Sequence, residues 1–434
     1  MKKAARWLCL LLGLAAAAGI EGCGSQSPVP PAGQQPPQSL QPERSGNEAA
    51  QEPVEPAMKP RDDIRDRVEA MSLDEKVGQL LLVGLEGTEV DGRAREWMHT
   101  YHAGGFILFR DNIQNAAQLA KLVGDLKEAN RSSGGVPLWL SLDEEGGRVS
   151  RMPAELAKPP SAAAVGRADK PAASLAVGRA VGRELAAFGM NMNFAPVLDV
   201  FSNPANTVIG DRAYGRDPAQ VSRIGIQTMK GLQSQQVAAV VKHFPGHGDT
   251  VEDSHYGLPV VAHDLERLRK LELKPFAEAI TSGADAVMVA HILLPKLDAE
   301  APASLSRRIV TGLLREEMDF GGVVVTDDLV MGAITKRYDL GQAGVQAVAA
   351  GVDVLLVGHG HEAGTAVFSA VKRAVQEGVI TEARLKESVT RILRLKAKYR
   401  LTDERPGAVD TAALNSGLKN AMKELEVTAP AGGK

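Results

Sequence analysis

The chain has two cysteines in 434 residues, which is too few for a disulfide-stabilised fold. Cys9 lies in an apolar N-terminal stretch that we expect to be removed with a signal peptide, so the mature chain would keep Cys23 alone and form no intrachain disulfide. A long hydrophobic run is also missing. The apolar segment from Trp7 to Ile20 is short for a membrane span.

The chain also has little net charge and few aromatic residues. The net charge is −3 and no basic tract follows the first few residues, so nothing indicates a nucleic-acid partner. Aromatic residues make up 4% of the chain, which leaves few platforms for stacking on bases or long polysaccharides. With 44% apolar and 24% charged residues, the composition is that of a globular protein of one large domain or two ordinary ones.

The N-terminus has the pattern of a bacterial lipoprotein signal. Three basic residues, Lys2, Lys3 and Arg6, precede the apolar stretch, and the sequence "IEGC" that ends at Cys23 resembles a lipobox. We therefore predict a signal peptide over residues 1–22 and a lipid anchor on Cys23. A free surface thiol at Cys23 is the alternative.

The segment after Cys23 is rich in Pro, Gln, Ser and Glu and has almost no large apolar residues. Such a composition cannot bury enough surface to offset its ordering entropy, so residues 23–61 are expected to form a disordered tether. These features predict a protein that is lipid-anchored on the extracytoplasmic face of the cell membrane and does not span it.

Residues 62–400 alternate between short apolar runs and amphipathic helical stretches. Each run is rich in Val, Leu or Ile, as in strands that are buried on both faces. The eight runs cover 79–85, 104–109, 137–142, 191–200, 237–244, 285–292, 321–328 and 352–360. The clearest helical patterns cover 115–130, 174–189, 264–283, 306–318 and 383–399.

This alternation predicts the α/β class and a single (β/α)8 TIM-type barrel over residues 62–400. An open doubly wound sheet is the alternative, but no G-x-G-x-x-G motif follows the first run. The tail, residues 401–434, is too short for a second domain.

Acids and histidines cluster directly after the apolar runs. "DEEGGR" follows the third run, "KHFPGHGD" leaves the fifth, "TDDL" leaves the seventh and "GHGH" follows the eighth. The carboxyl ends of barrel strands meet at one face, where the active sites of such barrels lie. The placement favours an enzyme.

The stretch "KHFPGHGDTVEDSH", residues 242–255, holds three histidines and three acids. Pro245, Gly246 and Gly248 prevent a stable helix there, and no H-E-x-x-H motif is present. A loop could still wrap a zinc ion, so a metal-dependent hydrolase stays open on this evidence.

A carboxylate nucleophile is the other possible chemistry. Asp327 and Asp328 directly follow "GGVVVT", so one of them is expected to point into the barrel mouth and to attack an electrophilic carbon such as the anomeric carbon of a sugar. Such attack needs a proton donor near the leaving oxygen. His255 could serve, because Asp253 two residues earlier can orient its ring.

Five segments together resemble glycoside hydrolase family 3 β-N-acetylhexosaminidases of the bacterial NagZ type, over about residues 62–400. They are "LDEEGGRVSRM" (142–152), "NFAPVLDV" (193–200), "IGDRAYGRDP" (209–218), "VKHFPGHGDTVEDSHYGLP" (241–259) and "VTDDLVMGAI" (325–334). The resemblance implies a nucleophile at Asp327, a general acid/base at His255 and an orienting carboxylate at Asp253. It also implies that no metal and no other cofactor is needed.

The resemblance further implies a sugar pocket of charged residues. Its members are Asp143, Arg151, Arg212, Lys242 and His243. Other polar residues are expected in supporting roles: a salt bridge at Arg148, support of neighbouring arginines by Asp199, loop bracing by His247, the pocket floor at His291, and the barrel rim at His359 and His361.

The implied activity is that of a retaining exo-β-N-acetylglucosaminidase. It would remove terminal GlcNAc from peptidoglycan-derived muropeptides in cell-wall turnover and recycling, and would act as a monomer. Two alternatives remain beside the metal-dependent hydrolase: a GlcNAc phosphorylase of the same family, and a non-catalytic sugar-binding lipoprotein. Larger family members carry an additional α/β sandwich domain that supplies part of the site.

Overall fold

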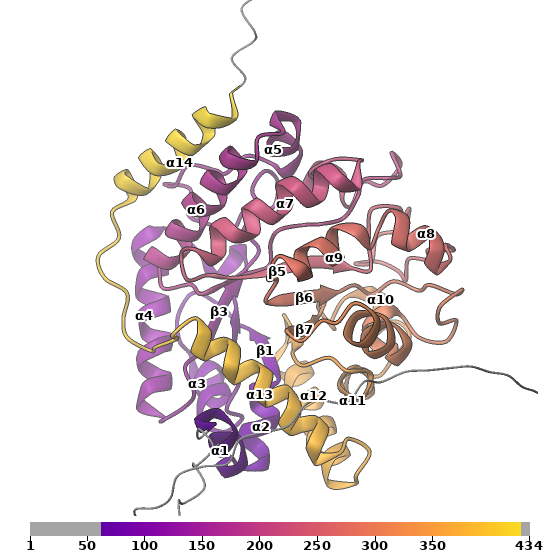
Figure 1. The fold of residues 1–434 in the computed structure, drawn as a ribbon. Helices are drawn as coiled ribbons and strands as arrows, with labels where there is room; N and C mark the ends of the chain where they lie inside the picture. Colours follow the sequence, from indigo (N-terminus) through magenta and orange to yellow (C-terminus); the bar gives the residue numbers. More distant parts are fainter. Residues whose placement is uncertain (1–61, 427–434) are drawn as a thin grey trace, which may run out of the picture. The chain divides into compact units, whose positions relative to one another are not determined.

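Strands of a parallel sheet form the centre of the protein, which we describe from a computed structural model (Figure 1). The structure describes residues 62–426, so the predicted signal peptide (1–22), the anchor at Cys23 and the tether (23–61) lie outside the described residues. Within the described part, no helix is both long and apolar enough to cross a membrane.

The described residues contain eight short strands, one in each of the eight predicted apolar runs. They are β1 (Leu81–Gly84), β2 (Gly105–Ile107), β3 (Trp139–Leu142), β4 (Met192–Asn193), β5 (Ala238–Phe244), β6 (Ala286–Val289), β7 (Val323–Thr326) and β8 (Leu355–Val357). All neighbours pair in parallel, in the order β7-β6-β5-β4-β3-β2-β1-β8. The predicted barrel is confirmed.

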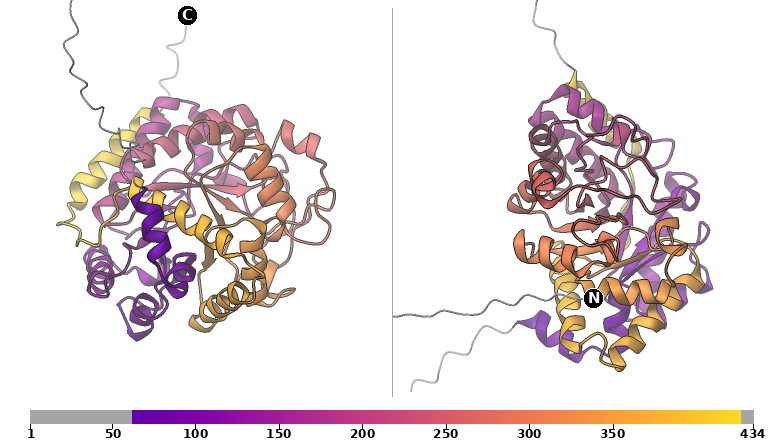
Figure 2. Two further views of the ribbon diagram at one scale, coloured as in Figure 1. Left: turned by 60° about the horizontal axis from the view of Figure 1, so that its bottom comes forward. Right: turned by 90° about the vertical axis from the view of Figure 1, so that its right-hand side faces the viewer.

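The contact between the two ends of this order closes the barrel. A parallel bridge joins Val325 to Val354, and the Thr326 amide donates a hydrogen bond to the Val354 carbonyl at 3.0 Å. Side chains of the strands are buried on both faces, because one face fills the barrel interior and helices cover the other (Figure 2). All eight carboxyl ends therefore open onto one mouth.

Helices follow the strands and surround them. The main ones are α3 (Gly92–His99), α4 (Ala116–Ser132), α6 (Pro171–Ala187), α7 (Pro218–Gln233), α11 (Leu340–Ala350), α12 (His361–Gln376) and α13 (Glu382–Lys398). Shorter ones are α1 (Asp63–Ala70), α2 (Leu73–Gln79), α5 (Ala162–Ala168), α8 (Leu265–Lys270), α9 (Lys274–Thr281), α10 (Gly332–Thr335) and the 3₁₀ turns η1 (Arg110–Asn112), η2 (Gly210–Arg212) and η3 (Ala303–Leu305).

Two predicted helices differ in detail. The pattern over 264–283 forms two helices, α8 and α9, because Pro275 has no amide hydrogen to continue a helix from the residues before it and instead lies in the first turn of α9. The pattern over 306–318 forms a π-helix, η4 (Arg308–Glu317), rather than an α-helix.

The segment after residue 400 ends in a helix that the sequence analysis did not predict. Asp410 caps α14 (Thr411–Leu425), and Leu414, Leu418 and Ala421 are buried where the helix packs on α6 (Figure 1). Asn415 on the same helix accepts a hydrogen bond from the Ala157 amide at 2.5 Å. The C-terminal segment is thus part of the barrel's outer layer.

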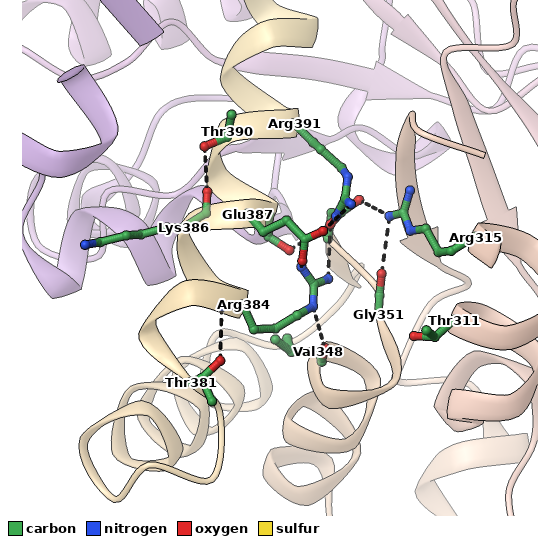
Figure 3. A network of polar contacts seen from close by, with 12 residues as sticks. Thr311, Arg315, Val348, Gly351, Thr381, Arg384, Lys386, Glu387, Thr390 and Arg391 are labelled. Carbon is green, nitrogen blue, oxygen red and sulfur yellow. Dashed lines mark hydrogen bonds and ion pairs between the residues drawn. The ribbon is translucent and has the colours of Figure 1, made fainter. Parts of the chain in front are cut away.

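The end of the barrel opposite the mouth holds a cluster of charged residues around a buried aspartate, which we call the basal network (Figure 3). Asp353, just before β8, is fully buried and contacts three guanidinium groups, those of Arg315, Arg384 and Arg391. Burial opposes ionisation of Asp353, but the three arginines outweigh it and lower its pKa. The network ties α13 and η4 to the strand layer.

Candidate active site

A cavity of about 380 Å³ opens at the mouth, at the carboxyl ends of the strands. Its lining includes seven of the eight predicted site residues: Asp143, Arg151, Arg212, Lys242, His243, His255 and Asp327. The eighth, Asp253, is hydrogen-bonded to His255. The structure therefore brings together residues that span almost two hundred positions of the chain.

Asp327 follows the last residue of β7, and its amide donates to the Val289 carbonyl of β6 at 2.9 Å. Its carboxylate faces the cavity and is otherwise enclosed by protein. This enclosure opposes ionisation, but His291, His243 and Lys242 outweigh it, so the pKa of Asp327 is lowered. Burial also lowers the pKa of His291, whereas Asp143 and Glu145 outweigh burial and raise the pKa of Lys242, which is charged at neutral pH.

Asp328 is held in a different way from Asp327. Its Oδ1 accepts hydrogen bonds from the Gly358 amide at 2.9 Å and the Val330 amide at 3.2 Å. A Cβ at Gly358 would lie 2.4 Å from the Asp328 carboxylate, so the approach requires glycine. Both aspartates line the cavity, but Asp328 also fixes the turn beyond β8, whereas the one hydrogen bond given to the Asp327 carboxylate comes from the neighbouring Asp328 amide at 2.9 Å, among the described residues.

His291 supports this turn from below. It is fully buried. Its Nδ1 lies 2.7 Å from the Ser304 hydroxyl, and its Nε2 lies 3.0 Å from the Asp328 carbonyl oxygen. It does not line the cavity, so the predicted place on the pocket floor is wrong. The residue lies one layer deeper, beneath the two aspartates.

A group of paired charges, which we call the mouth network, forms one wall of the cavity. Lys242 Nζ lies 2.5 Å from an Asp143 oxygen and 2.7 Å from a Glu145 oxygen. Both Glu145 oxygens accept from the Arg212 guanidinium at 2.8 Å. Burial opposes ionisation of Glu145, but Arg212 and Lys242 hold its pKa well below the usual range. Such fixed, charged groups are suited to binding sugar hydroxyls.

Glu145 is a site residue that the sequence analysis missed. It lies two residues after Asp143, beyond the end of β3, and its carboxylate reaches the same lysine as Asp143. Alternate residues of an extended chain point to the same side. The spacing in "DEEGG" was therefore a readable signal for a second acid at the mouth.

Glu144, between these two acids, has a separate role. Its Oε2 accepts from the amides of Arg151 at 2.8 Å and Met152 at 3.3 Å, and so holds the segment that carries Arg151. Burial raises the pKa of Glu144 to about 7. Burial and the nearby Glu144 raise the pKa of Glu184 on α6 to about 8. Each carboxyl has one oxygen with no hydrogen-bond partner among the described residues.

Asp199 pairs with histidines rather than with the arginines we predicted. Its Oδ2 lies 2.7 Å from His243 Nδ1, and its Oδ1 accepts the His247 amide at 2.6 Å. The other ring nitrogen of His243, Nε2, lies 3.3 Å from an Arg212 nitrogen at the cavity. Asp199 thereby fixes the ring orientation of the predicted sugar-binding histidine.

The Asp253–His255 pair lies on the loop between β5 and α8. His255 Nδ1 is 2.7 Å from Asp253 Oδ1, and 61% of the His255 side chain is exposed. Burial opposes ionisation of Asp253, but hydrogen bonds from His255 outweigh it and lower the pKa of Asp253. The His255 Nε2 atom has no protein partner in the described part of the chain, so it is available to a ligand in the cavity.

Neighbouring residues hold this loop in place. His247 is buried, and its ring contacts the Thr250 hydroxyl at 2.7 Å and the Ser254 hydroxyl at 3.2 Å. The amide of Gly332 on α10 donates to the His255 carbonyl at 3.2 Å. The burial lowers the pKa of His247 to about 4, so this ring is neutral at physiological pH. Its contacts match the predicted bracing role.

The three histidines of this stretch meet different partners: Asp199 for His243, Thr250 and Ser254 for His247, and Asp253 for His255. Among residues 62–426, no group of three or more His, Cys, Asp or Glu side chains is arranged to hold a metal ion.

Arg148 and the two rim histidines complete the mouth. Arg148 pairs with Asp211 at 2.9 Å and has the predicted salt-bridge role. His359 lines the cavity and stacks on Phe109, with ring centroids 4.4 Å apart. His361 lies away from the cavity, since it begins α12 and its ring packs near Trp97. The predicted rim position therefore holds for His359 and not for His361.

Residues 72–395 match the family model described as "Glycosyl hydrolase family 3 N terminal domain". The chain belongs to glycoside hydrolase family 3. The predicted family is thus confirmed, and the match covers every strand of the barrel.

Named relatives agree with this placement. The chain is 36% identical over 357 residues to Beta-hexosaminidase A of Pseudoalteromonas piscicida, which covers 77% of this chain and 60% of that relative. It is 32% identical over 335 residues to Beta-hexosaminidase of Stenotrophomonas maltophilia (strain K279a), covering 72% of this chain and 98% of the relative. The chain thus spans less than two thirds of the first relative and nearly all of the second.

Solved structures show the same fold. A glycoside hydrolase family 3 beta-N-acetylglucosaminidase from Paenibacillus sp. str. FPU-7 superposes with a TM-score of 0.78 at 43% identity, covering 82% of this chain and 69% of that one. Beta-N-acetylhexosaminidase from Beutenbergia cavernae DSM 12333 gives 0.71 at 31% identity, with 75% and 99% covered. These relatives support the predicted enzyme class, a glycoside hydrolase.

Proposed function

We propose that the chain is a retaining exo-β-N-acetylglucosaminidase in which Asp327 is the nucleophile and His255 the general acid/base. One observation carries the proposal: an ionised carboxylate at the end of β7 and a histidine oriented by an aspartate line the same cavity. The names of the relatives supply the sugar, β-linked N-acetylglucosamine.

In the first step Asp327 attacks C1 of the terminal sugar while His255 protonates the departing oxygen. The bond from C1 to that oxygen breaks, and a covalent glycosyl-enzyme forms. In the second step His255 takes a proton from water, and the water oxygen displaces Asp327 with overall retention. Asp253 accepts from His255 Nδ1, so the proton moves through Nε2.

The mouth network would hold the sugar before and during these steps. Lys242 and Arg212 donate to hydroxyl oxygens, and Asp143 accepts from hydroxyl hydrogens. Their mutual pairing means that no large rearrangement is needed on binding. A cavity of about 380 Å³ has room for one sugar ring and the start of a leaving group, which fits removal of a terminal residue.

The biological setting is a further part of the proposal. A lipid anchor at Cys23 would place the monomeric enzyme on the outer side of the cell membrane. There it would meet GlcNAc-containing muropeptides and other cell-wall fragments during turnover and recycling. Labelling of the full chain with a radioactive fatty acid, and its loss in Cys23→Ala, tests the anchor.

A GlcNAc phosphorylase is a second candidate. The proton carrier at the mouth is a histidine rather than a carboxylate, so an incoming phosphate would meet one anion fewer. Formation of GlcNAc-1-phosphate when phosphate is present would establish this activity.

The deciding experiment is turnover of 4-nitrophenyl β-N-acetylglucosaminide with EDTA present, by wild type, Asp327→Ala and His255→Ala. His99→Ala, exposed on α3, is the matched control. Turnover by wild type and the control alone, with a β-configured first product by NMR, supports the proposal. Activity that EDTA removes and Zn²⁺ restores would establish the metal-dependent hydrolase. Sugar binding with no turnover under any condition would indicate a non-catalytic binder.

A further inference from the structure

Two buried carboxyl groups, one on the segment after β3 and one on α6, have no cation of their own. Glu144 and Glu184 are each 2% exposed. Neither forms an ion pair in the described part of the chain, and Oε1 of each has no hydrogen-bond partner there. Other buried acids of the protein, such as Asp353 and Glu145, have arginines beside them. Glu144 and Glu184 are therefore costly to ionise, because burial penalises the charged form.

The two carboxyls face the same space inside the protein. Glu144 lines a small internal cavity together with Val177 and Val181 of α6. Glu184 follows Val181 by three residues, so it lies on the same face of that helix. The charge of Glu144 adds to the effect of burial in raising the pKa of Glu184 to about 8. The two groups are therefore close enough for the charge of one to act on the other.

The charged groups around this pair do not neutralise it. α7 and α14 both pack on α6, yet Glu144 is the one charged residue among those described that acts on Glu184. Burial raises the pKa of Glu144 to about 7, although the charge of Arg151 and hydrogen bonds to the Glu144 carboxylate oppose this. Glu145 and Arg212 line the same internal cavity, but they pair with each other.

Glu144 connects this pair to the catalytic cavity. Its Oε2 accepts from the amides of Arg151 at 2.8 Å and Met152 at 3.3 Å, and Arg151 lines the catalytic cavity. These two hydrogen bonds fix the backbone that carries the Arg151 side chain. A displacement of the Glu144 carboxyl would therefore move a residue of the predicted sugar pocket.

We propose that Glu184 is a positioning residue for Arg151, which it keeps in the sugar pocket by leaving Glu144 undisturbed as long as Glu184 holds its own proton. The inference rests on the proposed function, because that function gives Arg151 its sugar contact. When Glu184 is neutral, Glu144 can hold the two amides without repulsion. When Glu184 releases its proton to solvent, two uncompensated negative charges share a buried space, and their repulsion drives Glu144 away from the amides.

The expected consequence is weaker sugar binding at alkaline pH. The pKa is about 7 for Glu144 and about 8 for Glu184, so the doubly ionised pair forms as the pH rises from about 7 to about 9. Loss of one hydrogen bond from Arg151 to the sugar corresponds to a rise of about fivefold in Kd.

Calorimetric titration with GlcNAc at about pH 7 and about pH 9 tests the proposal without the chemical step. The Kd of wild type should rise about fivefold between the two. Glu184→Gln keeps the shape and stays neutral, so its Kd should not change. Glu144→Gln removes the charge from the other partner and should flatten the dependence as well. Glu377→Gln, at the exposed end of α12 and outside both cavities, is the matched control and should behave as wild type.

A spectroscopic measurement separates this role from a general effect on the fold. The infrared difference spectrum of wild type minus Glu184→Gln should show a protonated carboxyl at about pH 7 that is lost by about pH 9, in step with the rise in Kd. Circular dichroism at both pH values establishes that the proteins compared are folded.

A Kd of wild type that is the same at the two pH values, or an equal rise in Glu184→Gln, would overturn the inference and leave the glycosidase proposal intact. Absence of GlcNAc binding by wild type would also overturn the inference. Absence of turnover of the aryl glycoside in addition would overturn both.

Discussion

The two ends of the barrel each hold a buried cluster of acids and cations, but the clusters face different surroundings. In the mouth network Asp143 and Glu145 meet Lys242 and Arg212 along the wall of a cavity. In the basal network Asp353 is fully buried and meets three arginines, of which Arg315 comes from η4 and Arg384 and Arg391 from α13 (Figure 3). The same pairing chemistry therefore forms a cavity wall at one end and a structural joint at the other.

The two networks differ in whether their polar atoms face only protein partners or also face a cavity. Asp353 spends its oxygens on guanidinium groups, on the Ser388 hydroxyl at 2.7 Å and on the Val324 amide at 3.0 Å, so nothing remains for a ligand. At the mouth, Asp143 and Lys242 are paired yet border open volume. The two clusters therefore differ in the acid: the acids of the mouth network border the catalytic cavity, whereas Asp353 is spent on protein partners and only Arg391 of the basal network reaches a neighbouring cavity.

The largest effect is expected for Asp327→Ala at the mouth. Loss of the proposed nucleophile should lower kcat by about 10⁴-fold or more, since the other acids of the cavity, Asp143, Glu145 and Asp328, are held by protein partners of their own. The melting temperature should change little. Azide should restore turnover of the aryl glycoside and give the α-glycosyl azide, and failure of that rescue would argue against a nucleophilic role.

The basal network should respond in the opposite way. Asp353→Asn leaves three partly buried guanidinium groups without their anion, so the free energy of unfolding is expected to fall by about 3 kcal/mol. The kcat of the protein that remains folded should stay within about twofold of wild type, because the site lies at the far end. Urea unfolding followed by circular dichroism measures the loss. A large fall in kcat of folded protein would contradict the comparison.

Glu184 is a buried acid without a cationic partner among the described residues, in contrast to the paired acids of the two networks. Its pKa is raised from 4.5 to about 8, so the folded chain holds a proton that the unfolded chain releases above pH 4.5. The stability of the fold should therefore fall as pH rises from about 4.5 to about 8. Glu184→Gln removes the larger part of this dependence, the rest coming from Glu144 with its pKa of about 7, and should gain about 4 kcal/mol over wild type at pH 8, with little gain at pH 4.5. Melts across this pH range check it.

The smallest effect is expected for Asp253→Asn, which keeps the shape but removes the charge beside His255. The ring loses its orienting acceptor, so kcat should fall by about tenfold to hundredfold. The alkaline limb of the kcat/KM profile, where His255 loses the proton needed in the first step, should also move to lower pH, which a purely structural role would not cause. An unchanged profile would show that Asp253 does not tune His255.

Much of this architecture could be read from the sequence because the strands are short, apolar and evenly spaced. Asp327 was placed at a strand end, and strand ends share one mouth in a barrel, whereas the sugar-pocket residues and the role of His255 followed from the resemblance to the family. Partners across strands were harder to predict. Asp199 meets His243 and His247 rather than arginines, since the stagger between neighbouring strands decides which side chains meet.

Other differences between the predicted and the observed structure involve local sequence patterns that the sequence analysis did not use. The spacing of Leu414, Leu418 and Ala421 is helical and marks α14, yet the segment follows the last barrel helix and looked like a tail. Pro275 inside an apparent helix marked the break between α8 and α9. To predict Glu145 as a site residue, one has to note that alternate residues of the extended chain beyond β3 point to the same side, so that Glu145 faces the mouth as Asp143 does.

The hydrogen bonds of Asn415 give α14 a consequence beyond packing. Its amide nitrogen donates to the Glu155 carbonyl and its oxygen accepts from the Ala157 amide, in the segment that follows Arg151. A change in α14 would thus reach the loop that carries Arg151 at the cavity, while the Asp253–His255 pair and Asp327 are held by contacts elsewhere. The shape of this cavity wall and the arrangement of the two proposed catalytic groups rest on separable parts of the chain, so engineering can alter the first by editing a helix that does not line the cavity.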